Sequence, residues 1–238
     1  MGQQFGKLYL IPTGLGDQPV WDVLPQSIQK ILAFTDDYIV ENEKTARRFI
    51  KETHPEKLQP SLNFHVLNKY TEDAEKSTFL EACKSGKPMG LLSEAGCPAV
   101  ADPGSDIVKL AHENNIQVVP LVGPSSIIMA LMGSGMNGQS FAFNGYLPID
   151  KQERKAELKR LERVSQEQNQ SQLFIETPYR NNKMLEDLWS ILHPQTRVCV
   201  VCDLTLPTEY IKTFPAQDWK HTKVDLHKRP AIFIIHKD

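Results

Sequence analysis

The stretch GLLSEAGCPAVADPGSDIV, from Gly90 to Val108, decides the fold. With Met89 it begins as a short apolar run, which is typical of a buried strand. Small and turn-forming residues follow the run, and a segment that begins near Asp102 and Pro103 has the pattern of a helix. In open α/β sheets, ligands bind outside the carboxyl ends of the strands, so this turn is a candidate ligand site.

Working outward, strands and helices alternate through the first half of the chain. Short apolar or alternating runs predict strands at residues 7–13, 37–41, 62–67, 89–93 and 117–122. Apolar residues three and four apart predict helices at 24–34, 43–53, 72–86, 102–115 and 123–136. This alternation predicts an α/β domain with a mainly parallel, doubly wound sheet and helices on both faces.

The second half has fewer crossovers between strands. It predicts strands at residues 141–148, 172–180, 197–204, 208–214 and 229–238, with the strand at 208–214 paired antiparallel. A charged helix is expected over 151–168 and another over 181–192. We therefore expect a second α/β domain with a mixed sheet. The predicted domains are residues 1–122 and 123–238, joined by a linking helix at about 124–135.

Composition and cysteine spacing exclude several classes of protein. The chain of 238 residues is 40% hydrophobic, with a formal net charge of −2, so nucleic-acid binding would need a local basic patch. No apolar run is long enough for a membrane span or a signal peptide, which predicts a cytoplasmic protein. Cys199 and Cys202 form a C-x-x-C, but they lie in a predicted strand, where residues three apart face opposite sides. We expect reduced structural thiols and no metal site.

The ends of four predicted strands carry small residues and turn formers. These segments are PTGLGDQ at 12–18, EAGCPAVADPG at 94–104, GPSS at 123–126 and TPYR at 177–180. Gly14-x-Gly16 lacks the third glycine of a dinucleotide fingerprint, and none of the segments has a lysine suited to a phosphate. Any one of these turns could merely close a strand. Together they indicate a site made by backbone, which suits a nucleoside better than a nucleotide.

The order of these segments resembles the tetrapyrrole methylase family. That family comprises S-adenosylmethionine-dependent methyltransferases with two α/β domains and the cofactor in the cleft between them. The motifs LYLIPTGLGD, SEAGCPAVADPG, VVPLVGPSSIIMALMGSG, FAFNGYLP, LFIETPYR and RPAIFII cover nearly the whole chain. They look most like the branch that methylates a ribose 2′-hydroxyl in 16S ribosomal RNA. The resemblance therefore implies S-adenosylmethionine as cofactor, ribosomal RNA or the small ribosomal subunit as partner, and a homodimer.

The resemblance also implies which residues bind the cofactor. They come from the loops after the strands of both domains, with the second domain enclosing the adenine. The implied residues are Pro12, Ala95, Gly96, Cys97, Val100, Ala101, Ser125, Ser126, Tyr146, Thr177, Pro178, Pro230 and Ala231.

Carboxylates near the same turns are candidate catalytic groups, because a ribose hydroxyl gains from a nearby base when it accepts a methyl group. We favour Glu94, which lies in the turn after the predicted strand at 89–93, followed by Glu41. Asp102 and Glu176 are further candidates, although Asp102 is more simply explained as a carboxylate at a helix start. Arg180 is the candidate for pairing with a phosphate or a substrate carboxylate.

Several segments depart from the motifs of the rRNA-modifying branch. VENEKTARR keeps Glu41 but has Asn42 where an acid is expected, and CDLTL lacks an Arg and a Lys while retaining Asp203. TPYR lacks a His and keeps Arg180. These departures leave open a small-molecule methylase of tetrapyrrole type and a noncatalytic cofactor-binding or RNA-associated module.

The charged helix is the clearest local basic segment. Lys155, Lys159 and Arg163 form one line at helical spacing, which would suit an RNA backbone. The interspersed glutamates favour a solvated helix crossed by ion pairs, so this interpretation is preferred.

Overall fold

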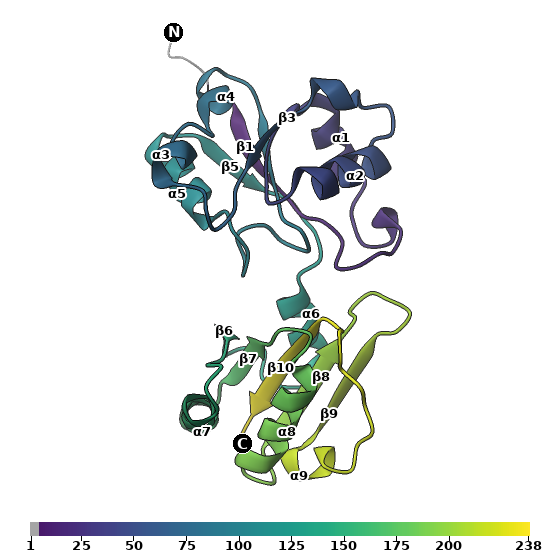
Figure 1. Ribbon diagram of the computed structural model, residues 1–238, viewed down its shortest axis with the longest axis vertical. Helices are drawn as coiled ribbons and strands as arrows, with labels where there is room; N and C mark the ends of the chain where they lie inside the picture. Colours follow the sequence, from purple (N-terminus) through teal and green to yellow (C-terminus); the bar gives the residue numbers. More distant parts are fainter. Residues whose placement is uncertain (1–4) are drawn as a thin grey trace. The chain divides into compact units, whose positions relative to one another are not determined.

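The computed structural model describes residues 5–238 (Figure 1). The chain divides into two compact units, one ending at Ser125 and the other beginning at Ser126. Each unit contains a five-stranded sheet, the first parallel and the second mixed. The predicted fold class of two α/β domains is confirmed.

The first sheet has the strand order β3-β2-β4-β1-β5, and all of its pairings are parallel. Its strands are β1 (Lys7–Ile11), β2 (Asp37–Val40), β3 (Asn63–Val66), β4 (Met89–Leu92) and β5 (Gln117–Pro120). Because the strands are parallel, their carboxyl ends share one edge. The loops after β1, β2 and β4 start from neighbouring positions there.

Helices cover both faces of this sheet, as the alternation predicts. They are α1 (Ser27–Phe34), α2 (Glu43–Thr53), α3 (Asp73–Lys76), α4 (Glu81–Lys84) and α5 (Ser105–Glu113), with single 3₁₀ turns at Val20–Asp22 and Gln59–Ser61. Figure 1 shows α1 and α2 on one side of the sheet and α3, α4 and α5 on the other. Each face has its own apolar cluster, centred on Ile28, Phe49 and Ile50 on one side and on Leu80 and Ile107 on the other.

The single helix expected over residues 72–86 is wrong, because the structure has two short helices there, α3 and α4. Between them, the hydroxyl of Ser77 donates to the Ala74 carbonyl and that of Thr78 donates to the Glu75 carbonyl. Such bonds offer the backbone an alternative to the helical ladder, so the helix stops.

The second sheet has the order β6-β7-β10-β8-β9. β6 and β7 are parallel, and the other pairings are antiparallel. The strand predicted to pair antiparallel, β9, does so with β8. Its strands are β6 (Phe141–Tyr146), β7 (Ser171–Ile175), β8 (Arg197–Cys202), β9 (Tyr210–Pro215) and β10 (Ala231–His236). Its helices are α6 (Ser126–Ser134), α7 (Lys151–Gln168), α8 (Asn181–Ile191) and α9 (Ala216–Trp219), the last of which is absent from the expectations above.

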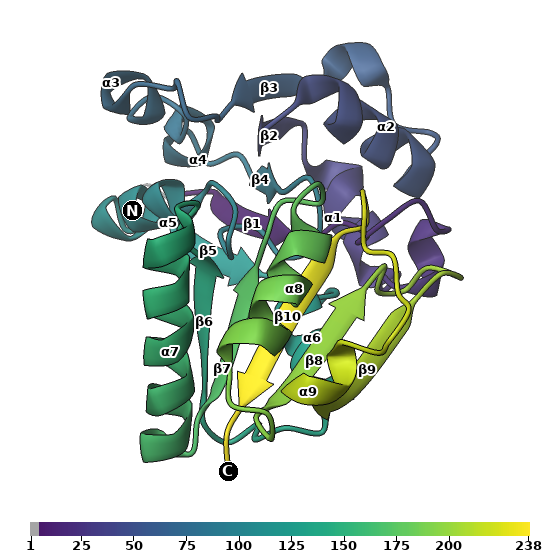
Figure 2. The same ribbon diagram turned by 60° about the horizontal axis from the view of Figure 1, so that its bottom comes forward.

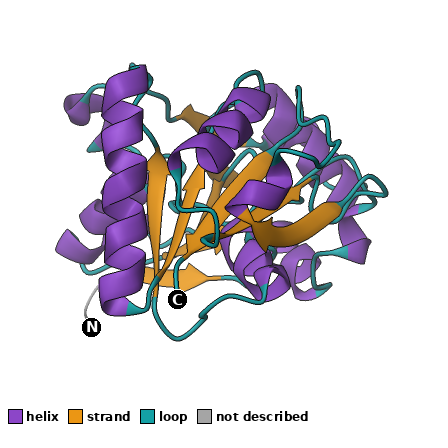
Figure 3. Ribbon diagram, turned by 90° about the horizontal axis from the view of Figure 1, so that it is seen from below, coloured by secondary structure: helices purple, strands orange, loops and turns teal. Residues whose placement is uncertain are grey.

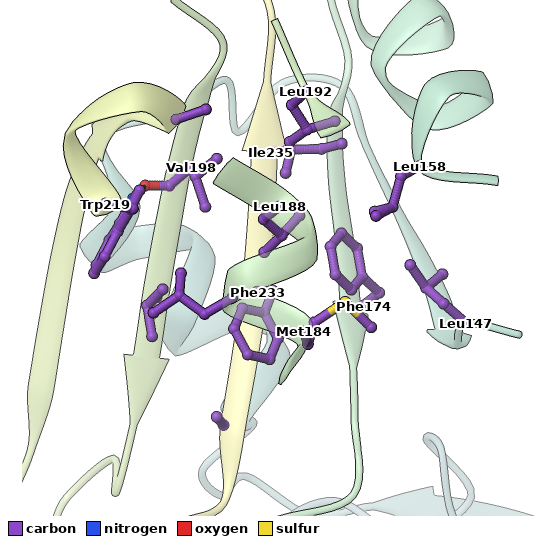
Figure 4. Close-up of a cluster of buried hydrophobic side chains, with 14 of the residues drawn as sticks. Leu147, Leu158, Phe174, Met184, Leu188, Leu192, Val198, Trp219, Phe233 and Ile235 are labelled. Carbon is purple, nitrogen blue, oxygen red and sulfur yellow. The ribbon is translucent and has the colours of Figure 1, made fainter. Parts of the chain in front are cut away.

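One large apolar cluster stabilises the second unit. Figure 2 shows α8 across one face of the sheet and α6 on the other. Figure 4 shows Leu188 of α8 near Phe174 of β7 and Phe233 of β10, and all three belong to the cluster. The indole of Trp219 closes one end of the cluster and donates to the Val198 carbonyl at 3.0 Å. Cys199 and Cys202 lie in β8 as buried free thiols.

The charged helix α7, the long purple helix in Figure 3, is partly buried. Arg160 pairs with Glu157 at its surface, as a solvated helix predicts. Arg154 differs, because its side chain is only 8% exposed and its guanidinium binds Asp187 of α8 at 2.7 Å. Arg154 also donates to the Ile149 carbonyl, so this basic residue anchors α7 to α8 and is not part of a surface patch.

Candidate active site at the strand ends

The turn after β4 is tied to the loop after β1 through Gly96. The Thr13 N–H donates to the Gly96 carbonyl at 3.0 Å, and the Gly96 N–H donates to the Gly14 carbonyl at 3.3 Å. The hydroxyl of Ser93, at the end of β4, donates to the same Gly96 carbonyl. Gly96 adopts φ +74°, a conformation that glycine adopts without steric cost. The two loops therefore form one hydrogen-bonded surface.

The loop after β5 joins this surface from the other side of β1. The thiol of Cys97 donates to the Pro124 carbonyl at 3.4 Å. A Cβ atom on Gly123 would lie 2.2 Å from Cγ of Pro12, so the loops after β1 and β5 are in direct contact. The predicted cofactor residues Pro12, Gly96 and Cys97 thus lie close together. Ser125 follows directly after this loop.

The rest of the turn after β4 is exposed and has unusual backbone geometry. Ala95, Val100 and Ala101 are exposed. Ala99 and Ala101 have φ angles of 63° and 61°, in the left-handed region that alanine seldom occupies. Small side chains and a hydrogen-bonded backbone give a ligand close access to the main chain, which fits the flat nucleoside portion of S-adenosylmethionine.

Three of the predicted carboxylates also lie together. Burial, together with the charges of Asp102 and Glu94, raises the pKa of Glu41 above its ordinary value, although the Glu94 N–H opposes this. The pKa of Asp102 is likewise raised by burial and by the charge of Glu94. Oε1 of Glu94 accepts a hydrogen bond from Oγ1 of Thr45 at 2.6 Å. A cluster of like charges of this kind favours uptake of a proton.

A cavity of about 450 Å³, entirely within the first unit, is lined by one of these carboxylates, Glu94. Its walls are the loop from Thr13 to Val20, one face of α2, and the end of β4 up to Glu94. This volume is in the range of small-molecule sites. The cavity therefore is a ligand-sized space whose wall includes both Glu94 and one face of helix α2.

The wall that α2 contributes was missed in the sequence analysis. Thr45, Arg48, Phe49 and Glu52 line the cavity at spacings of three and four residues. Their spacing shows that they share one helix face. However, the sequence does not show that this face borders a cavity, because that depends on the pairing of β2 with β4, whose ends Val40 and Leu92 also line it.

The predicted residues of the second unit lie at the same end of three neighbouring strands, β6, β7 and β10. Tyr146 ends β6 and pairs with Ile175, the last residue of β7, and Thr177 and Pro178 follow in the loop after β7. The Pro178 carbonyl accepts a hydrogen bond from the N–H of Lys228, which connects this loop to the segment before β10. Of the other two predicted residues, Pro230 ends that segment and Ala231 begins β10. Ser126 begins α6.

Arg180 and Glu176, two of the candidate polar groups, bind each other. Their side chains approach to 2.6 Å, and that of Glu176 is 2% exposed. The same Glu176 oxygen accepts the Thr177 N–H. In the neighbouring loop Asp203 forms an ion pair with Arg229 at 2.8 Å, a pairing that the sequence analysis missed. These pairs shape the loops of the second unit, and a role of Arg180 in binding substrate stays a prediction.

Two further features of the described residues limit the site. Among residues 5–238, no group of three His, Cys, Asp or Glu side chains is arranged to hold a metal ion. None of the helices in this range combines the length and apolar character that crossing a membrane requires.

Known proteins resemble this chain in sequence and in fold. Ribosomal RNA small subunit methyltransferase I of Vibrio cholerae is 28% identical over 232 residues, which is 96% of this chain and 76% of the relative. The protein of that name from Bacillus subtilis is 31% identical over 201 residues, 84% of this chain and 64% of the relative.

Two solved structures share the architecture at 16% sequence identity. The methyltransferase CobJ has a TM-score of 0.64 over 98% of this chain and 94% of its own. The uroporphyrin-III C-methyltransferase of Thermus thermophilus, in complex with S-adenosyl homocysteine, has a TM-score of 0.57 over 98% of each chain.

Fold and strand-end loops together define a class of two-domain α/β methyltransferases that use S-adenosylmethionine, as the sequence predicted. A model of one family in this class, the Tetrapyrrole (Corrin/Porphyrin) Methylases, matches residues 7–219. The chain belongs to that family.

Proposed function

We propose that this methyltransferase modifies a ribose 2′-hydroxyl of small-subunit ribosomal RNA. The names of the relatives from Vibrio cholerae and Bacillus subtilis support an RNA substrate. The observation that carries the proposal is the carboxylate of Glu94 in the cavity wall, with Glu41 and Asp102 close to it, because a ribose hydroxyl has a proton to lose and a carboxylate can accept it.

S-adenosylmethionine supplies a methyl group already activated by its sulfonium, so the protein mainly aligns the acceptor and manages the proton. A bond forms between the 2′-oxygen and the methyl carbon while the carbon–sulfur bond breaks. Glu94, at the wall of the cavity, accepts the hydrogen bond of the hydroxyl, and Thr45 orients its carboxylate. The single proton that is released passes to the Glu94 carboxylate, and Glu41 beside it is a second group that can take it up from there.

Glu41 suits the role of a second proton acceptor. Its Oε1 is buried and accepts no hydrogen bond from any residue in the described range 5–238. Its raised pKa brings its proton affinity closer to that needed for a base near neutral pH. The neighbouring charges of Glu94 and Asp102 raise that proton affinity further.

The cofactor itself is proposed to contact the surface formed by Pro12, Gly96, Cys97 and Ser125. The contribution of the second unit through Tyr146, Thr177, Pro178, Pro230 and Ala231 stays a prediction, as does that of Ser126. We also propose a homodimer and a cytoplasmic location, the compartment in which ribosomal RNA is modified in bacteria. Sedimentation of the purified chain tests the first of these proposals.

Methyl transfer from labelled S-adenosylmethionine tests the function. The acceptors are free small-subunit RNA and assembled small subunits from cells that lack this gene, and the modified nucleotide is then located. We expect one 2′-O-methylated nucleotide, formed about 100-fold more slowly by Glu94→Gln. Glu56→Gln is a matched control, because Glu56 is also exposed but lies outside the cavity.

Two results would contradict the proposal. Cofactor binding without transfer to either RNA would favour a noncatalytic module. Transfer to a tetrapyrrole precursor, without transfer to RNA, would favour a small-molecule methylase.

A further inference from the structure

The cavity of the first unit has an apolar floor. Val20, Val40, Phe49 and Leu92 line it, and each of these side chains is less than 10% exposed. They come from the loop after β1, the end of β2, helix α2 and the end of β4. A ligand that reaches this floor must present an apolar face of its own.

The wall of α2 carries polar groups with free capacity for hydrogen bonds. Arg48 lies 3.9 Å from Asp17, with side chains 72% and 96% exposed, so this pair contributes little. Glu52, one turn further along α2, makes no ion pair or hydrogen bond with any residue that the structure describes. The wall therefore offers a planar donor and a carboxylate acceptor side by side.

The charges of the cavity decide between an anionic and a neutral ligand. Asp17, Glu52 and Glu94 line it against the single cation Arg48. A phosphate or a polycarboxylate would meet net repulsion there. An uncharged heterocycle with flat apolar faces and an edge of donors and acceptors meets a complementary surface on every side, and this is the chemistry of a nucleobase.

We infer that this cavity holds the base of the nucleotide whose ribose accepts the methyl group, and that Arg48 and Glu52 bind the edge of that base. This inference rests on the proposed function. Sequence-specific RNA recognition commonly uses bases splayed out of their stack and bound through their edges. A base seated on this floor, with its edge toward Arg48 and Glu52, would leave its ribose toward solvent, and Glu94 is an exposed residue of the cavity wall that can reach it there.

The first test compares variants of helix α2 in methyl transfer to RNA. Arg48→Ala and Glu52→Gln are the cavity variants. Lys51→Ala on α2 and Glu56→Gln in the turn after α2 are exposed controls that do not line the cavity. We expect each cavity variant to lower kcat/KM for RNA about tenfold or more, the effect of losing one edge contact. The affinity for S-adenosylmethionine, measured by calorimetry, should be unchanged in all four variants.

Base identity provides a more specific readout. RNA substrates with each of the four bases at the modified position should differ in kcat/KM with the wild-type protein. The differences should shrink in Arg48→Ala and Glu52→Gln. Merely structural damage would instead lower all four rates in proportion, so unchanged ratios between bases would overturn the inference.

A second measurement separates this inference from the proposed function. Saturation-transfer NMR with cytidine, uridine, adenosine and guanosine, in the presence of S-adenosyl homocysteine, reports nucleoside binding without turnover. Binding that is lost in Arg48→Ala and kept in Lys51→Ala supports the inference, even if wild-type protein methylates no RNA. If the wild-type protein methylates RNA and the cavity variants keep its full activity and its base preference, the inference is refuted while the proposed function stands. If the wild-type protein shows no RNA turnover and no nucleoside binding, both the inference and the proposed function are refuted.

Discussion

Replacing Gly96 by Ala tests whether the turn after β4 depends on its backbone geometry. An alanine at φ +74° costs about 1–2 kcal/mol of unfolding free energy from strain alone. The new Cβ would also lie 3.1 Å from Cδ2 of Leu15 and 3.3 Å from the Pro124 carbonyl oxygen. Crowding in a packed region adds about 1 kcal/mol or more, so we expect a total loss of about 2–3 kcal/mol.

Gly135→Ala is a matched control, because Gly135 has φ +67° and, apart from its chain neighbours, no residue of the described range 5–238 has an atom within 4 Å of the position of its Cβ. This variant tests the backbone strain without the crowding, and we expect its free energy of unfolding to fall by about 1–2 kcal/mol. Urea unfolding measures both losses, and calorimetry measures cofactor affinity. Displacement of the turn should weaken S-adenosylmethionine binding about tenfold, equivalent to about 1.4 kcal/mol, in Gly96→Ala only. Equal stability losses and unchanged affinity would refute the role assigned to this turn.

Three further predictions concern buried groups. Asp187→Ala leaves the Arg154 guanidinium buried without its carboxylate, so the free energy of unfolding in urea should fall by about 3–5 kcal/mol. The double variant Arg154→Met/Asp187→Leu should recover much of that free energy. Because the folded protein binds the Glu41 proton more tightly than the unfolded chain does, Glu41 makes the fold less stable as pH rises from its ordinary pKa of 4.5 through the raised value. Glu41→Gln should therefore be more stable than the wild-type protein at pH 7, with no gain well below pH 4.5; an equal gain at both pH values would contradict this. Burial raises the pKa of Cys83 to about 12 and those of Cys199 and Cys202 to about 11, so these thiols are protonated and shielded from reagents at about pH 8. Iodoacetamide at that pH should therefore modify the partly exposed Cys97 first in the native protein. Mass spectrometry of the peptides checks this order, and S-adenosylmethionine should protect Cys97 if its turn holds the cofactor.

Local patterns in the sequence were sufficient for most of the fold. Helices α2 and α7 have the predicted bounds, because a side-chain cap begins each of them and their apolar residues recur at helical spacing. Asn42 caps α2 by accepting from the N–H groups of Lys44 and Thr45. The break between α3 and α4 was missed, since it depends on the hydroxyl groups of Ser77 and Thr78 competing with the helical hydrogen bonds.

The candidate site was predictable only where it follows the ends of strands. Parallel strands bring their carboxyl ends to one edge, so Gly96 and Pro12 could be placed near each other from the sequence. The cavity was not predictable, because it depends on which strands are neighbours and on the orientation of α2. The pairing of Arg154 with Asp187 joins residues 33 positions apart, and helical periodicity says nothing about partners on another helix.

The chain passes between its two compact units a single time, at Ser125 and Ser126. Each unit encloses its own apolar clusters and completes its own sheet. A gene interrupted at this junction would therefore still encode two self-contained polypeptides, and the first of them would carry the whole cavity and all three proposed carboxylates. Recombination at this point would exchange the second half, with its proposed share of cofactor binding, while leaving the cavity and the three carboxylates of the first half unchanged.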